Sequence, residues 1–194
     1  LTRTLNKPAT NFPSHTDRTK TPGVDLTTGS LGQGMSTATG AALGNKIDGR
    51  DNHVYVFVGD GECDEGQVWE AAQFAAHYKL DNLTCFVDNN KNQLDGPVDT
   101  VMSHGKGIGA KFDAFGWNVI DVADGNDVEQ IYDAVQEALT VKGVPTCIVL
   151  NTIKGKGATF AEPSGAHSSQ PSPEQWEEAI AAAEAELAAV KAAK

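Results

Sequence analysis

The segment 54–96 constrains the fold of this chain most strongly, because it holds two apolar runs separated by a helical stretch. The first run, VYVFV, is followed by a Gly-Asp-Gly turn at 59–61, and the second, LTCFV, is followed by Asp-Asn-Asn at 88–90. Continuous apolar runs that alternate with helices are typical of a parallel sheet covered on both faces. The spacing therefore predicts two adjacent parallel strands, with Asp60 just past the end of the first and Asn90 just past the end of the second.

The remainder of the chain continues this alternation. We expect irregular loops before residue 33 and from 89 to about 102. Further helices are predicted over 33–48, 65–79, 106–115, 128–141 and 172–194, and further strands over 117–122 and 146–150. One face of the 128–141 helix carries four apolar residues, which are Val128, Ile131, Val135 and Leu139.

Together these elements predict a doubly wound α/β fold, with a mostly parallel sheet and helices on both faces. The length of 194 residues suits a single domain spanning 1–194. The first residue is Leu rather than Met, so we expect the domain to be incomplete at its N-terminus. The alanine-rich segment 172–194 is predicted to be a C-terminal surface helix.

Composition argues against several classes of function. The net charge of −11 disfavours a nucleic-acid partner and an anionic membrane surface, because both are bound by clustered Lys and Arg. No apolar stretch approaches the length that spans a membrane. The three cysteines, Cys63, Cys85 and Cys147, form no CxxC pair, so neither a zinc site nor a disulfide framework is expected. We interpret them as buried thiols of a protein in a reducing cytoplasm.

The two strand ends predict a cation and phosphate site. A right-handed helical crossover brings the carboxyl ends of parallel strands side by side, and ligands bind at that edge. Mg²⁺ prefers oxygen ligands, commonly one or two protein groups together with phosphates and water. The candidate ligands are the Asp60 carboxylate, the Asn90 amide oxygen and a main-chain carbonyl near Asn92. Gly59 and Gly61 would let a diphosphate approach closely.

A simpler interpretation is that the Gly-Asp-Gly sequence is only a strand-to-helix turn capped by Asp60. For that motif alone the turn is the better interpretation. The correctly spaced Asn90, also placed after a buried strand, favours cofactor binding. A plain nucleotide site is disfavoured, because the chain has neither a GxGxxG after the first strand nor a P-loop.

Six motifs in the same order resemble one enzyme family. The motifs are PGVDLTTGSLGQG, GDGECDEGQVWEAA, YKLDNL, DNNKNQLDG, FGWNVIDVADG and TIKGKG. From about residue 5 to 176 the chain resembles the N-terminal, diphosphate-binding half of transketolase, a thiamine-diphosphate enzyme. Its length resembles the split form of that enzyme, in which the two halves are separate subunits.

The resemblance implies roles for individual residues. Asp60 and Asn90 would bind Mg²⁺ (or Ca²⁺ or Mn²⁺), with Asn92 supplying a carbonyl oxygen. The remaining cofactor contacts would come from Gly29, Ser30, Leu31, Gly59, Gly61, Glu62 and His167. The segment 29–31 would run alongside the aminopyrimidine ring, with Leu31 supplying an apolar contact. Gly61 would donate its N–H to the diphosphate.

The resemblance also implies a catalytic set of Glu65, Glu70 and His167. The two glutamates match acidic residues near the dimer interface, and His167 matches a histidine that approaches the diphosphate and substrate. From the residues alone, Glu65 and Glu70 are solvated acids near a helix start, and His167 is an exposed loop histidine. The family has Lys where Asn151 stands, and it has a Gly-His segment upstream of residue 1.

The activity implied by the resemblance is transfer of a two-carbon ketol unit between sugar phosphates, in the pentose phosphate pathway of the cytoplasm. A partner subunit that binds the pyrimidine end would complete the site, in a heterotetramer with two copies of each half. One alternative is a different thiamine-diphosphate enzyme, such as a 1-deoxyxylulose 5-phosphate synthase or a 2-oxoacid dehydrogenase subunit. Another is a truncated, non-catalytic subunit that keeps only cofactor affinity or an assembly surface.

Overall fold

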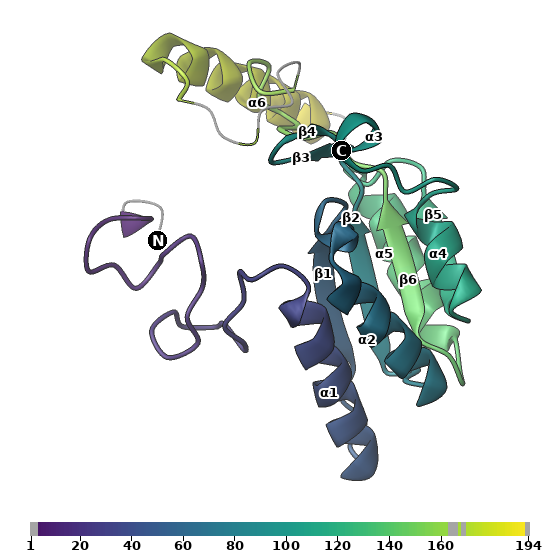
Figure 1. The fold of residues 1–194 in the computed structure, drawn as a ribbon. Helices are drawn as coiled ribbons and strands as arrows, with labels where there is room; N and C mark the ends of the chain where they lie inside the picture. The colour runs from purple at the N-terminus through teal and green to yellow at the C-terminus, as the bar shows by residue number, and fades with distance from the viewer. Residues whose placement is uncertain (1–3, 163–166, 168–169, 193–194) are drawn as a thin grey trace.

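A parallel β-sheet forms the centre of the molecule. The computed structural model describes residues 4–162, 167 and 170–192. Within them, four parallel strands pair in the order β1-β2-β6-β5 (Figure 1). The strands are β1 (Val54–Gly59), β2 (Leu83–Asp88), β5 (Asn118–Val122) and β6 (Thr146–Leu150). The α/β prediction is confirmed.

Helices cover both faces of this sheet. Three of them, α1 (Gln33–Ile47), α2 (Gly66–His77) and α4 (Ile108–Ala114), lie on one face, and α5 (Val128–Thr140) lies on the other (Figure 1). Because side chains alternate along a strand, Cys85 and Val87 of β2 join the core under the first three helices, while Phe86 joins the core under α5.

The β1 strand lies at an edge of the sheet and pairs only with β2 among the described residues. Val56 and Val58 point into the core, whereas Tyr55 and Phe57 point to the other face, where α5 packs mainly against β5 and β6. Phe57 stacks on the ring of Phe86 with centroids 4.5 Å apart, and its side chain is still 67% exposed. This edge of the sheet is therefore both open and aromatic.

The segment predicted as a loop from 89 to 102 contains regular structure, so that prediction is wrong. It folds into a small hairpin of β3 (Asn92–Gln93) and β4 (Gly96–Pro97), followed by the single-turn helix α3 (Val98–Val101). Strands of two residues are too short to show a periodic apolar pattern, so the sequence carries no signal for them.

The apolar face predicted for α5 is also wrong in part. Val128 is 77% exposed and Leu139 is exposed as well, whereas Ala134 and Ala138 are buried. The buried side is formed by Ile131 together with the two alanines and Val135, at the same helical spacing. Alanine marks the buried side because it allows the helix to lie close to the sheet.

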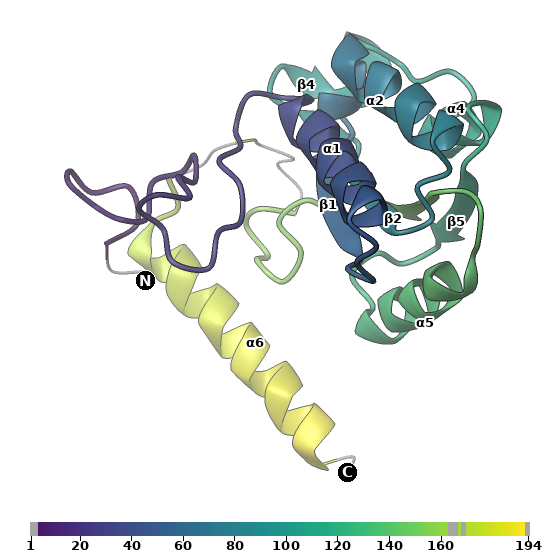
Figure 2. The ribbon, with the colours of Figure 1, turned by 90° about the horizontal axis from the view of Figure 1, so that it is seen from below.

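The C-terminal helix α6 (Pro173–Ala192) runs away from the sheet (Figure 2). Near its start, Trp176 packs edge-on against Phe160, with ring centroids 5.2 Å apart. In the part of the chain that the structure describes, no helix is both long and apolar enough to cross a membrane. Cys63, Cys85 and Cys147 are buried free thiols, as the sequence predicts.

Candidate functional site

The turn after β1 and the turn after β2 meet at the Asp60 carboxylate. Asp60 is only 2% exposed. One of its carboxylate oxygens accepts a hydrogen bond from the N–H of Gly61 (2.8 Å), and the other accepts one from the N–H of Lys91 (2.5 Å). Lys91 directly follows Asn90, and the register pairs Gly59 with Asp88. The structure therefore brings Asp60 next to the segment that carries Asn90.

The segment 90–92 is folded into a tight turn. The Asn90 amide oxygen accepts a hydrogen bond from the N–H of Asn92 (3.0 Å), and its amide nitrogen donates one to Asp88 (3.1 Å). The Asn92 side chain donates back to the Asn90 carbonyl (3.3 Å), and Lys91 adopts the left-handed conformation, with φ of 66°. These contacts fix the conformation of the turn that carries the predicted ligands Asn90 and Asn92, and the N–H of Lys91 joins this turn to Asp60.

Burial raises the pKa of Asp60 above its ordinary value of 3.8, because the carboxylate is withdrawn from water. The N–H groups of Gly61 and Lys91 oppose this shift, and the nearby Asp88 adds to it.

The described residues contain no group of three or more His, Cys, Asp or Glu side chains that could hold a metal. A cation held here by one carboxylate and amide-type oxygens needs further oxygens from outside the protein, and the donor set therefore fits Mg²⁺ bound to a diphosphate.

Gly61 is required by the close approach of the β3–β4 hairpin. A Cβ atom at this position would lie 2.5 Å from the Cβ of Gln93. The Gln93 amide nitrogen is buried, and it has no hydrogen-bond partner within the part of the chain described here. The turn at 59–61 and the hairpin thus form one closely packed unit around Asp60.

The loop at 29–31 is attached to the same turn through Glu62, which belongs to the short 3₁₀ helix η2 (Glu62–Asp64). One Glu62 carboxylate oxygen accepts a hydrogen bond from the N–H of Gly32 (2.9 Å), and the other accepts one from the N–H of Gly59 (3.1 Å). Ser30 and Leu31 are exposed at this position. Glu62 therefore holds the loop and the end of β1 together.

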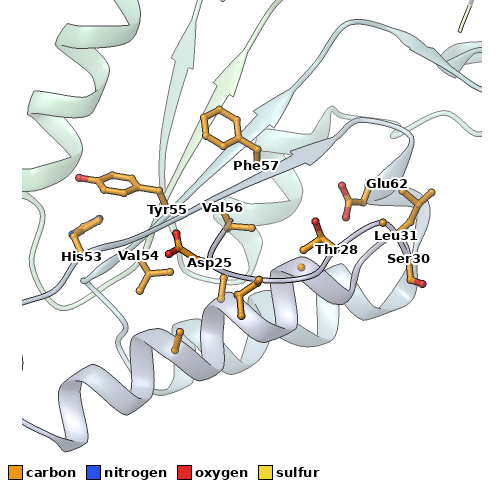
Figure 3. Close-up of a pocket in the computed structure, with 15 residues that line it drawn as sticks. Asp25, Thr28, Ser30, Leu31, His53, Val54, Tyr55, Val56, Phe57 and Glu62 are labelled. Carbon is orange, nitrogen blue, oxygen red and sulfur yellow. The ribbon is translucent and has the colours of Figure 1, made fainter. Parts of the chain in front are cut away.

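A cavity of about 780 Å³ extends from Glu62 along β1 to His53, between the strand, the segment 25–31 and α1. In Figure 3, Val54 and Val56 lie on the side of α1, while Tyr55 and Phe57 point away from it. The loop at 29–31 forms part of its wall, and the cavity is lined mainly by apolar groups. Its walls are suited to a ring or another apolar group rather than to a phosphate.

The three predicted catalytic residues are exposed, and a Cβ added at Gly32 would lie 3.3 Å from the Cβ of one of them, Glu65. Glu65 is exposed at the N-terminal cap of α2, and Glu70 is exposed on that helix. His167 is also exposed, and the Nζ atom of Lys154 lies 3.4 Å from its Nδ1. No hydrogen bond or ion pair joins Glu65, Glu70 or His167 to Asp60 among the described residues. Their catalytic roles stay predictions.

Sequence reasoning missed His104. It is 8% exposed, its Nε2 lies 3.0 Å from the main-chain carbonyl oxygen of Asp60, and its Nδ1 lies 3.0 Å from the Nζ of Lys111. The two partners come from the turn after β1 and from α4. A contact across 44 residues leaves no local signal in the MSHGKG sequence, so only the three-dimensional structure reveals it.

Comparison with known proteins identifies the family. The family described as "Transketolase, thiamine diphosphate binding domain" matches residues 3–187. The chain is 46% identical over 187 residues to a 6-deoxy-6-sulfo-D-fructose transketolase subunit (SqwG) of Clostridium sp. (strain MSTE9), covering 96% of this chain and 67% of that protein. It is 42% identical over 151 residues to an apulose-4-phosphate transketolase subunit of Actinobacillus succinogenes, covering 78% of this chain and 54% of that one.

Solved structures agree with the sequence comparison. Transketolase from Pichia stipitis in complex with sedoheptulose-7-phosphate superimposes with a TM-score of 0.77 at 32% identity, over 82% of this chain and 25% of that chain. Transketolase from Leishmania mexicana gives a TM-score of 0.75 at 33% identity, again over 25% of its length. The chain thus spans about half to two thirds of the two subunits above and about a quarter of these solved enzymes. It belongs to the transketolase family and carries that family's thiamine diphosphate-binding domain.

Proposed function

We propose that this chain holds the Mg²⁺–diphosphate end of thiamine diphosphate with Asp60, Asn90 and the carbonyl of Asn92, while Gly61 donates its N–H to the diphosphate. The observation that carries the proposal is the buried Asp60 carboxylate, which bonds the backbone next to Asn90. A buried carboxylate is stabilised by a cation, and the two further oxygen donors lie in the adjacent turn.

The loop at 29–31 would contact the ring end of the cofactor. Leu31 supplies an exposed apolar side chain, and Glu62 holds the loop at a fixed place relative to the turn at 59–61. When bound, thiamine diphosphate supplies the electron sink needed to break a carbon–carbon bond beside a carbonyl. The residues of this chain fix the metal and the anion, and they orient the cofactor.

We assign the chain to a two-subunit transferase that moves a two-carbon ketol unit between anionic sugars. The relatives named above are subunits of transketolases acting on 6-deoxy-6-sulfo-D-fructose and on apulose 4-phosphate, so this class of substrate is the one to test. A pyrimidine-binding subunit would complete the cleft, in an assembly with two copies of each subunit. Glu65 and Glu70 would lie near the dimer interface of that assembly. His167 would approach the substrate. Three free buried thiols are consistent with a cytoplasmic protein.

Calorimetric titration of the chain with thiamine diphosphate and Mg²⁺ tests cofactor binding. Asp60→Ala should abolish the heat of binding, because it removes the only carboxylate of the proposed ligand set. Asp113→Asn, an exposed acid on α4, is the matched control and should bind as the unsubstituted chain does. Equal binding by the Asp60 and Asp113 variants would contradict the proposed site.

Turnover tests the reaction itself. Three ketoses are tested as donors, each with ribose 5-phosphate as the acceptor: xylulose 5-phosphate, 6-deoxy-6-sulfo-D-fructose and apulose 4-phosphate. At least one pair should react, and only when a pyrimidine-binding subunit is added. Full activity of the isolated chain would refute the requirement for a partner. Cofactor binding without turnover in the reconstituted complex would instead identify a non-catalytic subunit.

A further inference from the structure

One buried histidine contacts the proposed metal site from outside the motifs that define it. His104 lies in the loop between α3 and α4, and its imidazole reaches the main-chain carbonyl of Asp60. We infer that His104 is a positioning residue, which fixes the backbone of Asp60 so that the carboxylate is directed at the metal position. The inference rests on the proposed function, because it concerns the same site.

The neighbours of His104 determine which ring nitrogen carries the proton. The Lys111 ammonium has only donors, so the Nδ1 atom 3.0 Å away must accept a hydrogen bond. The proton of the neutral ring therefore lies on Nε2, which donates to the Asp60 carbonyl at 3.0 Å. The same Nε2 lies 3.7 Å from the carboxylate of Asp64, and Lys111 itself lies over the ring of Trp69. Lys111 thus holds His104 in the form that can bind Asp60.

This hydrogen bond fixes the one part of Asp60 that the neighbouring turns leave weakly held. The carboxylate is bonded to the N–H groups of Gly61 and Lys91. Apart from His104, the carbonyl of Asp60 accepts only the N–H of Cys63 (3.1 Å) in the described structure, which is a contact within a single turn. His104 adds an anchor from a distant element. Groups that orient a metal ligand in this way commonly change metal affinity 10- to 100-fold when they are replaced.

The experiment compares three variants of the full chain. His104→Leu removes both hydrogen bonds, whereas His104→Gln keeps a donor for Asp60 and an acceptor for Lys111. The control is His53→Leu, because His53 is a half-buried histidine that also makes a hydrogen bond, to the Thr84 hydroxyl (2.8 Å), but at the opposite end of β1. A merely structural role would make the two leucine variants alike.

Two measurements are made on each variant. Hydrogen exchange, measured without cofactor, gives the exchange rates of the Gly61 and Lys91 backbone amides. Both should exchange about fivefold to tenfold faster in His104→Leu than in the unsubstituted chain. Calorimetric titration with Mg²⁺ at saturating thiamine diphosphate should show about tenfold weaker binding by His104→Leu. His104→Gln should stay within about twofold of the unsubstituted chain in both measurements, and His53→Leu should change neither.

Two results would overturn the inference. One is a His104→Leu variant with unchanged exchange at Gly61 and Lys91, and the other is an equal change in His53→Leu. Exchange is measured without cofactor, so a chain that binds no thiamine diphosphate would overturn the proposed function while the exchange comparison still decides the role of His104.

Discussion

Glu62 bonds the backbone of Gly32 across thirty residues of sequence, and this contact attaches the loop before α1 to the turn after β1. The same carboxylate bonds Gly59 with its second oxygen. Both sides of the proposed cofactor site therefore depend on one side chain. The contact also explains why an acid directly follows the Gly-Asp-Gly turn.

Replacing Glu62 should loosen the loop at 29–31. Glu62→Ala removes both hydrogen bonds to a charged acceptor and should cost about 2 kcal/mol in the free energy of unfolding. Glu62→Gln keeps one acceptor oxygen and should cost less. Limited proteolysis should cut the region 25–32 faster in the alanine variant. Equal cutting rates in both variants and in the unsubstituted chain would contradict this role.

A methyl group at position 61 should disrupt the packing of the hairpin. Gly61→Ala would bring a Cβ atom to 2.5 Å from the Gln93 Cβ, so the backbone must shift, at a cost of about 1 to 3 kcal/mol. Gly66→Ala at the start of α2 is the matched control, because its new methyl group meets nothing within 4 Å. Thermal unfolding should show a lower Tm for Gly61→Ala and an unchanged or higher Tm for Gly66→Ala. A similar Tm for the two variants would show that the hairpin yields at no cost.

The raised pKa of Asp60 predicts a pH dependence of stability. The folded pKa lies above the unfolded value of 3.8, so the stability associated with protonated Asp60 is present below pH 3.8 and is lost as pH rises through the folded pKa. Asp60→Asn removes this titration. The Tm of Asp60→Asn minus the Tm of the unsubstituted chain should therefore increase from pH 4 to pH 7.

Cofactor should reverse this trend. Mg²⁺ with thiamine diphosphate binds the ionised carboxylate in the proposed site, and it stabilises the folded state of the unsubstituted chain by mass action. Added cofactor should raise the Tm of the unsubstituted chain at pH 7 and leave that of Asp60→Asn nearly unchanged. In the measurement without cofactor, a Tm difference between Asp60→Asn and the unsubstituted chain that stays constant from pH 4 to pH 7 would contradict the raised pKa of Asp60.

The buried side of α5 can be tested with a pair of substitutions on one helix. Ala138→Leu should destabilise the fold by about 1 to 3 kcal/mol, because the added carbons have no room against the sheet. Val128→Leu, at an exposed position, should change the free energy of unfolding by less than about 0.5 kcal/mol. Urea unfolding measures both. An equal loss in the two variants would place Val128 in the core.

The sequence was sufficient for the elements whose signals are local. The strands at 54–58, 83–88 and 146–150 are continuous apolar runs, and the parallel order of β1 and β2 follows from the helix between them. The expected burial holds for β2 and β6, whereas in β1 Tyr55 and Phe57 are exposed because that strand lies at an edge of the sheet. The proximity of Asp60 to the segment carrying Asn90 is a consequence of that topology. It could therefore be predicted from spacing.

The remaining features depend on contacts distant in sequence or on packing. His104 meets Asp60 across 44 residues, and its surroundings in the chain resemble an ordinary polar loop. The hairpin at 92–97 is too short to have a period. The face of α5 was misassigned because Val128 and Leu139 repeat at helical spacing, whereas the width of the gap beside the sheet selects Ala134 and Ala138.

One edge of β1 has no partner strand among the described residues, and this edge affects how the isolated chain behaves in concentrated solution. The backbone N–H and C=O groups on this edge can pair with another extended polypeptide. Natural proteins usually protect such edges with charge, proline or a covering element. The Tyr55 and Phe57 rings are exposed on the adjacent face of the sheet and add apolar contact area beside this edge. We therefore expect the isolated chain to aggregate through this strand at high protein concentration.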